Sequence, residues 1–107
     1  MADELGPFQA LWDAWNEVHD EMMKKDLPHF VGAIQIQLDE LQQHRQLNNR
    51  EAAAREAIDI ISIALNYLRQ QGYQSEEIAE LARSRAERRM LGRTKAILKK
   101  YQDEHGI

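Results

Sequence analysis

The chain has 107 residues, enough for one small domain, and carries 18 acidic and 14 basic side chains for a net charge of −4. This balance argues against a general coat for nucleic acid, and the lack of cysteine excludes disulfides and thiolate metal sites. No apolar run approaches the roughly 20 residues needed to span a bilayer, and no apolar signal core opens the chain, so we expect a cytoplasmic protein with no membrane partner. Few prolines and glycines among abundant Ala, Leu, Gln, Glu and Arg predict an all-α fold of four to five helices.

The first predicted helix begins near Pro7 and ends between Lys24 and Leu27. Its apolar side chains recur at helical spacing and include Trp12 and Trp15. That spacing favours packing in a core or an interface for both tryptophans, with stacking on a nucleotide base as the alternative. Asp26 is a suitable cap for the next helix.

The second and third predicted helices span about 28–46 and 50–71. Leu47-Asn48-Asn49 separates them, and a connection this short predicts an antiparallel hairpin. Gly72 has the position of a left-handed cap. The third helix is apolar on two sides, which is typical of a helix in the centre of a bundle or at a subunit interface.

Two acids, Glu56 and Asp59, stand inside the apolar third helix, three residues apart and therefore on one face. A buried carboxylate without a partner is costly, so two explanations compete. One is a divalent metal site; the other is a set of ion pairs with arginines such as Arg50, Arg55 or Arg83. The hairpin would bring Glu40 toward both acids, unless Glu40 lies on a solvated face. The histidines show no metal-ligand spacing and are expected at the surface or its boundary: His19, His29, His44 and His105.

A fourth helix is predicted from a cap at Ser75, and Gly92 is expected to bend or end it. It is strongly basic, with Arg83, Arg85, Arg88, Arg89 and Arg93. Arginine forks match phosphate oxygens, whereas the competing interpretation is a solvated face whose arginines pair with nearby glutamates. A role in nucleic-acid binding is less favoured because aromatic residues are not interleaved with the arginines. A last helix over 94–101 is expected to pack through Ile97, Leu98 and Tyr101.

Two segments together resemble a known family. The third helix contains Glu56-Ala-Ile-Asp59, an E-x-x-D motif among apolar residues. The second contains Ile36-Gln37-Leu38-Asp39-Glu40-Leu41 where an E-E-x-x-E-L motif would stand, with Glu40 the only one of its three acids retained. This pairing resembles the all-α MazG-like nucleotide pyrophosphohydrolases. The resemblance covers roughly residues 27–90, which we take as a helical core flanked by an N-terminal helix (1–26) and a C-terminal helical tail (91–107).

The resemblance implies hydrolysis of a nucleoside triphosphate, or a related nucleotide, to the monophosphate and pyrophosphate. Glu40, Glu56 and Asp59 would be the catalytic residues and the ligands of Mg²⁺, or of Mn²⁺ in its place. Substrate binding is assigned to Gln37, Asn66, Arg83, Arg85, Arg88 and Arg89. The helical bundle would be completed in a homodimer or homotetramer. Because Ile36 and Gln37 replace two acids, the alternatives are a non-catalytic helical interaction module and, less favoured, a basic-helix adaptor for nucleic acid.

Overall fold

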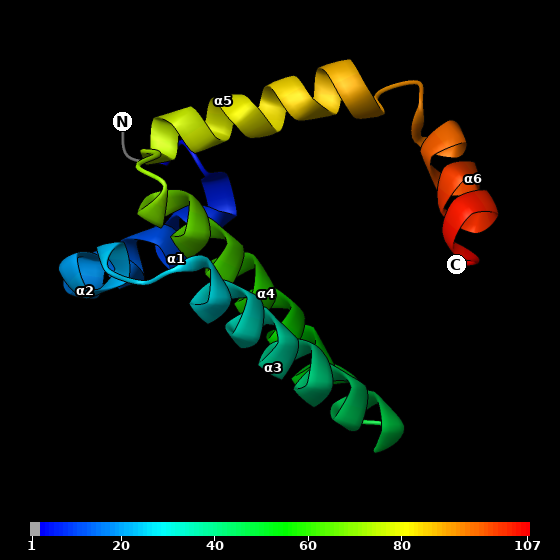
Figure 1. The fold of residues 1–107 in the computed structure, drawn as a ribbon, viewed down its shortest axis with the longest axis horizontal. Coiled ribbons are helices and arrows are strands. Elements are labelled where there is room, and N and C mark those ends of the chain that lie inside the picture. The colour runs from blue at the N-terminus through cyan, green and yellow to red at the C-terminus, as the bar shows by residue number, and fades with distance from the viewer. Residues whose placement is uncertain (1–2) are drawn as a thin grey trace.

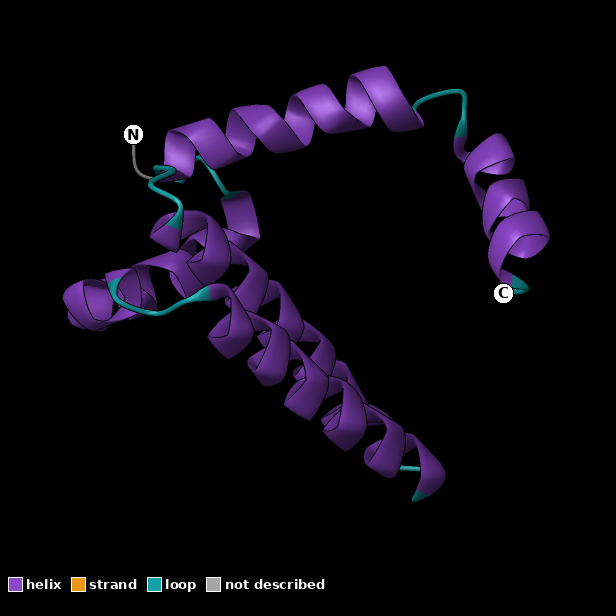
Figure 2. Ribbon diagram, viewed as in Figure 1, coloured by secondary structure: helices purple, strands orange, loops and turns teal. Residues whose placement is uncertain are grey.

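The computed structural model describes residues 3–107, and this part of the chain is helical throughout, without a strand (Figures 1 and 2). Four long helices follow a set of short N-terminal turns. The long helices are α3 (Leu27–Gln46), α4 (Arg50–Gln70), α5 (Ser75–Arg85) and α6 (Thr94–His105), with a π-helical turn, η3 (Ala86–Met90), between the last two. The prediction of an all-α fold is confirmed. No helix of the described residues is long and apolar enough to cross a membrane.

The predicted antiparallel hairpin is confirmed: α3 and α4 lie side by side along most of their length (Figure 1). The Asp26 carboxylate accepts a hydrogen bond from the His29 backbone N–H at 3.2 Å and so caps α3, as expected. Asn48 adopts a left-handed conformation with φ of 59°, and Asn49 caps α4 by accepting from the Ala52 N–H at 3.1 Å. Two asparagines in succession thus reverse the chain within three residues.

The N-terminal segment is not the single helix that was predicted. It consists of four short pieces that cross the end of the hairpin: η1 (Gly6–Phe8), α1 (Gln9–Ala14), η2 (Trp15–Val18) and α2 (His19–Met23). Arg69 of α4 holds this segment. Its guanidinium donates to the Trp12 carbonyl at 2.6 Å and to Asn16 Oδ1 at 2.9 Å, and lies 3.9 Å from the centre of the Trp12 ring. The Trp12 carbonyl is thereby satisfied from outside the helix, close to where the α-helical turn gives way to a 3₁₀ turn.

The helix α5 begins at Ser75, one residue earlier than a cap at that position predicts. Gln74, not Ser75, is the N-cap, and its backbone N–H donates to Glu77 Oε1 at 2.8 Å. Near this start Ile78 is buried among Leu5, Phe8 and Ile61. The first turns of α5 therefore belong to the same core as the hairpin.

Beyond its first turns α5 extends away from the hairpin, and α6 follows the C-terminal end of α5, also away from the hairpin (Figure 1). Gly92, with φ of 77°, separates them and ends the basic helix, as the sequence indicated. The helix α6 continues to His105, four residues past the predicted end. Leu98 and Tyr101 are exposed, so the expectation that α6 packs through these residues is wrong for a single chain. We call residues 83–101 the basic arm.

Candidate functional site

Three carboxylates meet across the hairpin. Glu56 and Asp59 come from α4, and Glu40 comes from the facing turn of α3. The pKa of Glu56 is raised from 4.5 to about 7, first because its carboxyl shares a hydrogen bond with that of Glu40. Burial adds to the rise, since the Glu56 side chain is only 12% exposed, and the like charges of Glu40 and Asp59 add further. Near neutral pH this cluster therefore holds a proton that isolated carboxyls would have lost.

His44 joins this cluster, which the search for metal-ligand spacing missed. Its Nε2 atom lies 3.7 Å from Glu56 Oε2, one turn of α3 beyond Glu40. The signal was present in the sequence as the four-residue interval between Glu40 and His44, which places both on one face of a helix. The site is thus three carboxyls with an imidazole at its edge.

The arginines that were the alternative ion-pair partners of these acids do not pair with them. Arg55 pairs with Glu51 at 3.3 Å, one turn away on the exposed face of α4, and Arg83 pairs with Glu80 on α5. Within residues 3–107 no arginine forms an ion pair with the three carboxylates. The negative charge of the cluster is therefore not neutralised by the basic residues of the same chain.

The carboxylate oxygens of the cluster are chemically suitable ligands for a hard divalent cation, but they are not arranged around a common point where an ion could bind. Magnesium prefers carboxylate oxygens, and the cluster supplies them from two adjacent helices. Yet among the described residues no group of three or more His, Asp or Glu side chains stands close enough to hold an ion. The proximity of Glu40 instead raises the pKa of Glu56, which favours a protonated carboxyl there. Cation binding would displace that proton, as it does wherever the ligands must ionise first.

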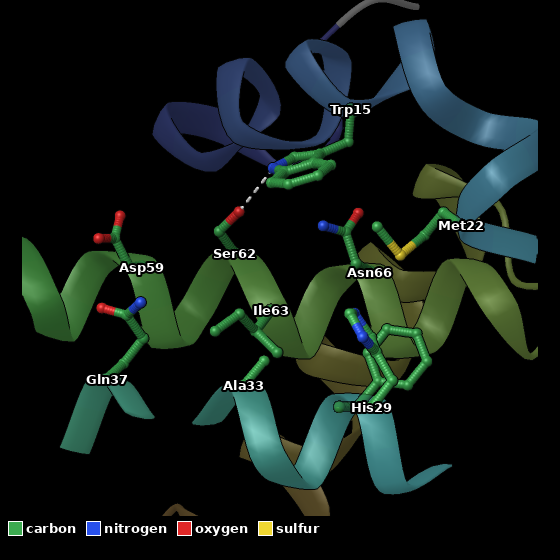
Figure 3. A pocket seen from close by; sticks show the side chains of 10 residues that line it. Trp15, Met22, His29, Ala33, Gln37, Asp59, Ser62, Ile63 and Asn66 are labelled. Carbon is green, nitrogen blue, oxygen red and sulfur yellow. Dashed lines mark hydrogen bonds between the residues drawn. The ribbon is translucent and has the colours of Figure 1, made fainter. Parts of the chain in front are cut away.

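A cavity of about 390 Å³ opens beside the cluster (Figure 3). It lies between the N-terminal segment, α3 and α4, and Asp59 stands at one end of it. Trp15 covers it from the N-terminal segment and is fixed by a hydrogen bond from its indole Nε1 to Ser62 Oγ, 2.9 Å long. His29 lies toward the other end (Figure 3), and Phe30 is a further aromatic residue of the lining. The volume and the aromatic walls suit a planar ring such as a nucleobase.

Two amide oxygens without partners line the same cavity. Asn66 is 3% exposed, yet its Oδ1 makes no hydrogen bond, and Gln37 Oε1 is also buried and unpaired. Unsatisfied buried polar atoms are costly, and a ligand with polar edges would satisfy them. Both residues were assigned to substrate binding from the sequence, and the structure places both on this cavity.

Trp15, His29 and Ser62 were not among the predicted site residues. Trp12 and Trp15 looked alike in the sequence because both fit the apolar stripe of one helix. The break at Ala14 separates them: Trp12 is buried beneath Arg69, whereas Trp15 is 37% exposed and turned to the cavity. No periodicity in the sequence marks that break.

The predicted phosphate-binding arginines are not brought to the carboxylates within one chain. Arg83 lies beside Ile78 at the root of α5. Arg85 and Arg89 line a separate hollow with Tyr101 and His105 of α6, and Arg88 lies on the π-helical turn η3 between them. The basic arm and the acidic cluster are thus two separate features of the molecule.

Comparisons with protein-family models, curated proteins and solved structures gave no match. The resemblance to MazG-like enzymes therefore depends on the residues of the two helices alone.

Proposed function

We propose that the protein is a Mg²⁺-dependent nucleotide pyrophosphohydrolase that cleaves a nucleoside triphosphate to the monophosphate and pyrophosphate. One observation carries the proposal: Asp59, a member of the carboxylate cluster, lines a cavity with aromatic walls and unpaired amide oxygens. A nucleotide has the matching parts, an anionic chain that needs a cation and a flat ring that needs stacking and hydrogen bonds. The carboxylates of α3 and α4 would bind the cation and the phosphate chain, and the cavity between these helices and the N-terminal segment would bind the ring.

In this proposal Glu40, Glu56 and Asp59 hold the cation. When bound, it neutralises the phosphates and positions a water for attack on phosphorus. Trp15 and His29 flank the base, and the amides of Asn66 and Gln37 bond to its edges or to the sugar. Since Gln37 replaces an acid, the cation would be held by fewer charges than a full acidic motif supplies, which predicts weak Mg²⁺ affinity.

We expect a homodimer or homotetramer as the working form. Large apolar side chains remain exposed on the hairpin as well as on the basic arm, including Val31, Leu38, Leu91 and Leu98. A monomer of 107 residues that left these exposed would be prone to association.

A non-catalytic helical interaction module is the second candidate. Ile36 and Gln37 stand where the resembled motif has acids, and the remaining carboxyls are not arranged around an ion. In such a module the Glu40–Glu56 proton would be a permanent structural hydrogen bond, with no cation to replace it. The two candidates differ in what Mg²⁺ does to the folded protein.

The deciding experiment measures pyrophosphate release from a panel of canonical and modified nucleoside triphosphates, with and without Mg²⁺. The wild type is compared with Glu56→Gln and with Glu51→Gln, an exposed glutamate on the same helix that pairs only with Arg55. We expect Mg²⁺-dependent release that falls at least about a hundredfold in Glu56→Gln and is unchanged in Glu51→Gln.

Absence of release from every nucleotide, together with no thermal stabilisation by Mg²⁺, would overturn the enzyme and favour the interaction module. Release that persists in Glu56→Gln would place the catalytic site elsewhere in the molecule. The panel also reveals which base the cavity accepts.

A further inference from the structure

Basic side chains from both sides of a corner in the chain line one hollow of about 310 Å³ in the basic arm. Arg85 and Arg89 line it from α5 and the π-helical turn η3, and Lys100 lines it from α6. A second hollow of about 250 Å³ shares Arg89 and Lys100 with the first and adds Arg93. None of the described residues that line either hollow is acidic. The two hollows together form a concave, positively charged surface, which we call the basic groove.

The backbone between η3 and α6 creates this groove by reversing the chain. The Leu91 backbone N–H donates to the Ala86 carbonyl at 2.9 Å and closes the wide π-helical turn. Gly92 follows with a left-handed φ of 77°, a conformation in which other residues are strained, and α6 begins at Thr94. Figure 1 shows α6 turned away from the axis of α5 beyond this corner. The basic residues of η3 and α6 therefore meet across the groove although they are separated in the sequence.

The cations of the groove have no acidic partner in the described part of the chain. Among residues 3–107, Arg85, Arg89 and Lys100 form no ion pair. The basic arm as a whole carries eight basic side chains and one acidic side chain. A concave surface lined by charge of one sign concentrates its field and attracts counter-ions. The groove is thus suited to a ligand that carries several negative charges.

An aromatic ring stands among these charges. Tyr101 of α6 lines the first hollow together with Arg85 and Arg89, and it is 49% exposed. His105 lies one turn further along α6, with its ring centre 6.0 Å from that of Tyr101. The sequence shows no aromatic residues interleaved with the arginines, but the corner at Gly92 brings Tyr101 beside them in space. Arginine forks that bind phosphates and an exposed ring that stacks on a base are the elements by which proteins bind single-stranded nucleic acid.

The shape of the groove favours a strand over an anionic bilayer or a duplex. A flat bilayer cannot enter a concave surface, and the exposed Leu91 and Leu98, which could enter a bilayer, do not line either hollow. A duplex keeps its bases stacked on one another, so they are not free to stack on Tyr101. A single strand offers both its phosphates and the faces of its bases.

We propose that the basic groove binds single-stranded nucleic acid, with phosphates on Arg85, Arg89 and Lys100 and one base stacked on Tyr101. The residues that line the groove are all different from those that line the cavity beside Asp59. The proposal is therefore independent of the proposed function, and either can fail without the other.

Fluorescence anisotropy of a labelled single strand of about 12 nucleotides, as DNA and as RNA, tests the role of the charges with the full chain. Arg89→Gln with Lys100→Gln removes two charges that line both hollows, and Arg88→Gln with Lys95→Gln removes two charges of the same arm that line neither. We expect affinity to fall about tenfold or more in the first variant and less than about threefold in the second. The slope of log affinity against log salt should fall by about 1.4 in the first variant, since each phosphate contact contributes about 0.7 for single strands.

Substitution of Tyr101 tests the stacking. We expect Tyr101→Ala to weaken binding about tenfold and Tyr101→Phe to retain most of the affinity, because phenylalanine keeps the ring. Tyr73→Ala is the matched control, since Tyr73 is a partly exposed tyrosine that lines neither hollow, and its affinity should be unchanged. All the substituted side chains are exposed, so circular dichroism should show the wild-type helix content in every variant.

Several outcomes would overturn the proposal. One is the absence of binding to either strand at about 0.1 M salt, and another is an equal loss of affinity in the groove variant and its arm control. If Tyr101→Ala binds as tightly as the wild type, or a duplex of the same sequence binds as tightly as the strand, the groove does not stack bases and the assignment to a single strand is wrong. Binding to vesicles of phosphatidylserine and phosphatidylcholine, without binding to either strand, would make the groove a membrane contact instead.

Discussion

The N-terminal and C-terminal regions of this molecule differ in whether their apolar side chains are buried. Residues 3–78 form a region in which side chains join distant parts of the chain: Arg69 ties the N-terminal segment to α4, and Phe30 packs edge-on against Tyr67 across the hairpin. Residues beyond Ile78 also form helices, although α6 begins without a side-chain cap, and they leave most of their large apolar side chains exposed. Helix formation is local and needs only the right sequence nearby, whereas burial needs a second surface. The hairpin region contains that surface and the arm does not.

This contrast assigns different roles to the two regions. The hairpin and the N-terminal segment hold the cavity and the carboxylates, so under the proposed function they would set which ligand enters and how it is bound. Among the described residues the arm forms two ion pairs with its own chain, Arg83–Glu80 and Lys99–Asp103, and its exposed apolar side chains would be covered only by another molecule. Substitutions in the first region should therefore change folding, and substitutions in the second should change association.

The largest effect is expected at Arg69. Replacement by Met removes the hydrogen bonds to the Trp12 carbonyl and to Asn16 Oδ1, together with the contact with the Trp12 ring, which hold the N-terminal segment on α4. We expect a loss of about 3 kcal/mol in the free energy of unfolding, measured by urea denaturation. Arg55→Met, which breaks only an exposed pair with Glu51, should stay within about 0.5 kcal/mol of the wild type.

A loss below about 1 kcal/mol in Arg69→Met would show that the N-terminal segment is held by its apolar contacts alone. The first region would then be less specifically built than its hydrogen bonds indicate. A red shift of tryptophan fluorescence in the folded variant would localise the damage to Trp12 and Trp15.

The second effect is expected at the cavity wall. Trp15→Ala removes the ring that covers the cavity, and loss of one stacked aromatic typically costs about 1–3 kcal/mol in binding a base. We expect KM for the preferred nucleotide to rise about tenfold or more, with little change in kcat. Trp15→Phe should retain most of the affinity, since it keeps a stacking ring and loses only the hydrogen bond to Ser62.

Phe8→Ala is the control for Trp15→Ala, because Phe8 is an aromatic residue of the same segment that lines a different hollow. Equal rises in KM for both variants would mean that the segment acts as a whole. In that case Trp15 would not be the stacking residue.

The third effect is a pH dependence of the metal-free protein. Because the pKa of Glu56 is about 7 in the folded state and near 4.5 otherwise, the folded state binds more protons between these values. Stability should therefore fall as pH rises from about 4.5 to 7. The thermal midpoint of the wild type is measured at each pH, and that of Glu56→Gln is subtracted from it. This difference isolates the contribution of Glu56 from that of the rest of the protein. Mg²⁺ added above pH 7 should restore stability to the wild type only; a flat difference curve would contradict the shared proton.

Much of the fold was predictable because its signals are local. Asp26 and Gly92 mark a helix start and a helix end through their own backbone preferences, and a three-residue connection leaves little choice but an antiparallel hairpin. The same geometry explains why Glu40 was expected near Glu56 and Asp59. Residues on facing helices of a tight hairpin meet at positions counted outward from the turn.

The remaining features depend on contacts between distant residues. The N-terminal helix breaks where Arg69, more than fifty positions away, binds the Trp12 carbonyl, so its interruption has no local signal. Trp15 acquires its place on the cavity from that break. The arm was expected to pack because Leu98 and Tyr101 have helical spacing, but spacing shows that a face is apolar and not what covers it.

The smallest effect on the single chain is expected at Leu98, and it tests the contrast most directly. Leu98→Ser removes an apolar side chain that is already 59% exposed, so the unfolding free energy of a dilute sample should change by less than about 0.5 kcal/mol. Ile78→Ser, at the buried root of the same arm, should cost several times more. Sedimentation equilibrium should show the reverse ranking for association among folded molecules, with Leu98→Ser weakening the expected dimer, in which this side chain would be buried. If Leu98→Ser leaves both stability and association unchanged, α6 is a solvated helix and the two regions differ only in how well they are packed.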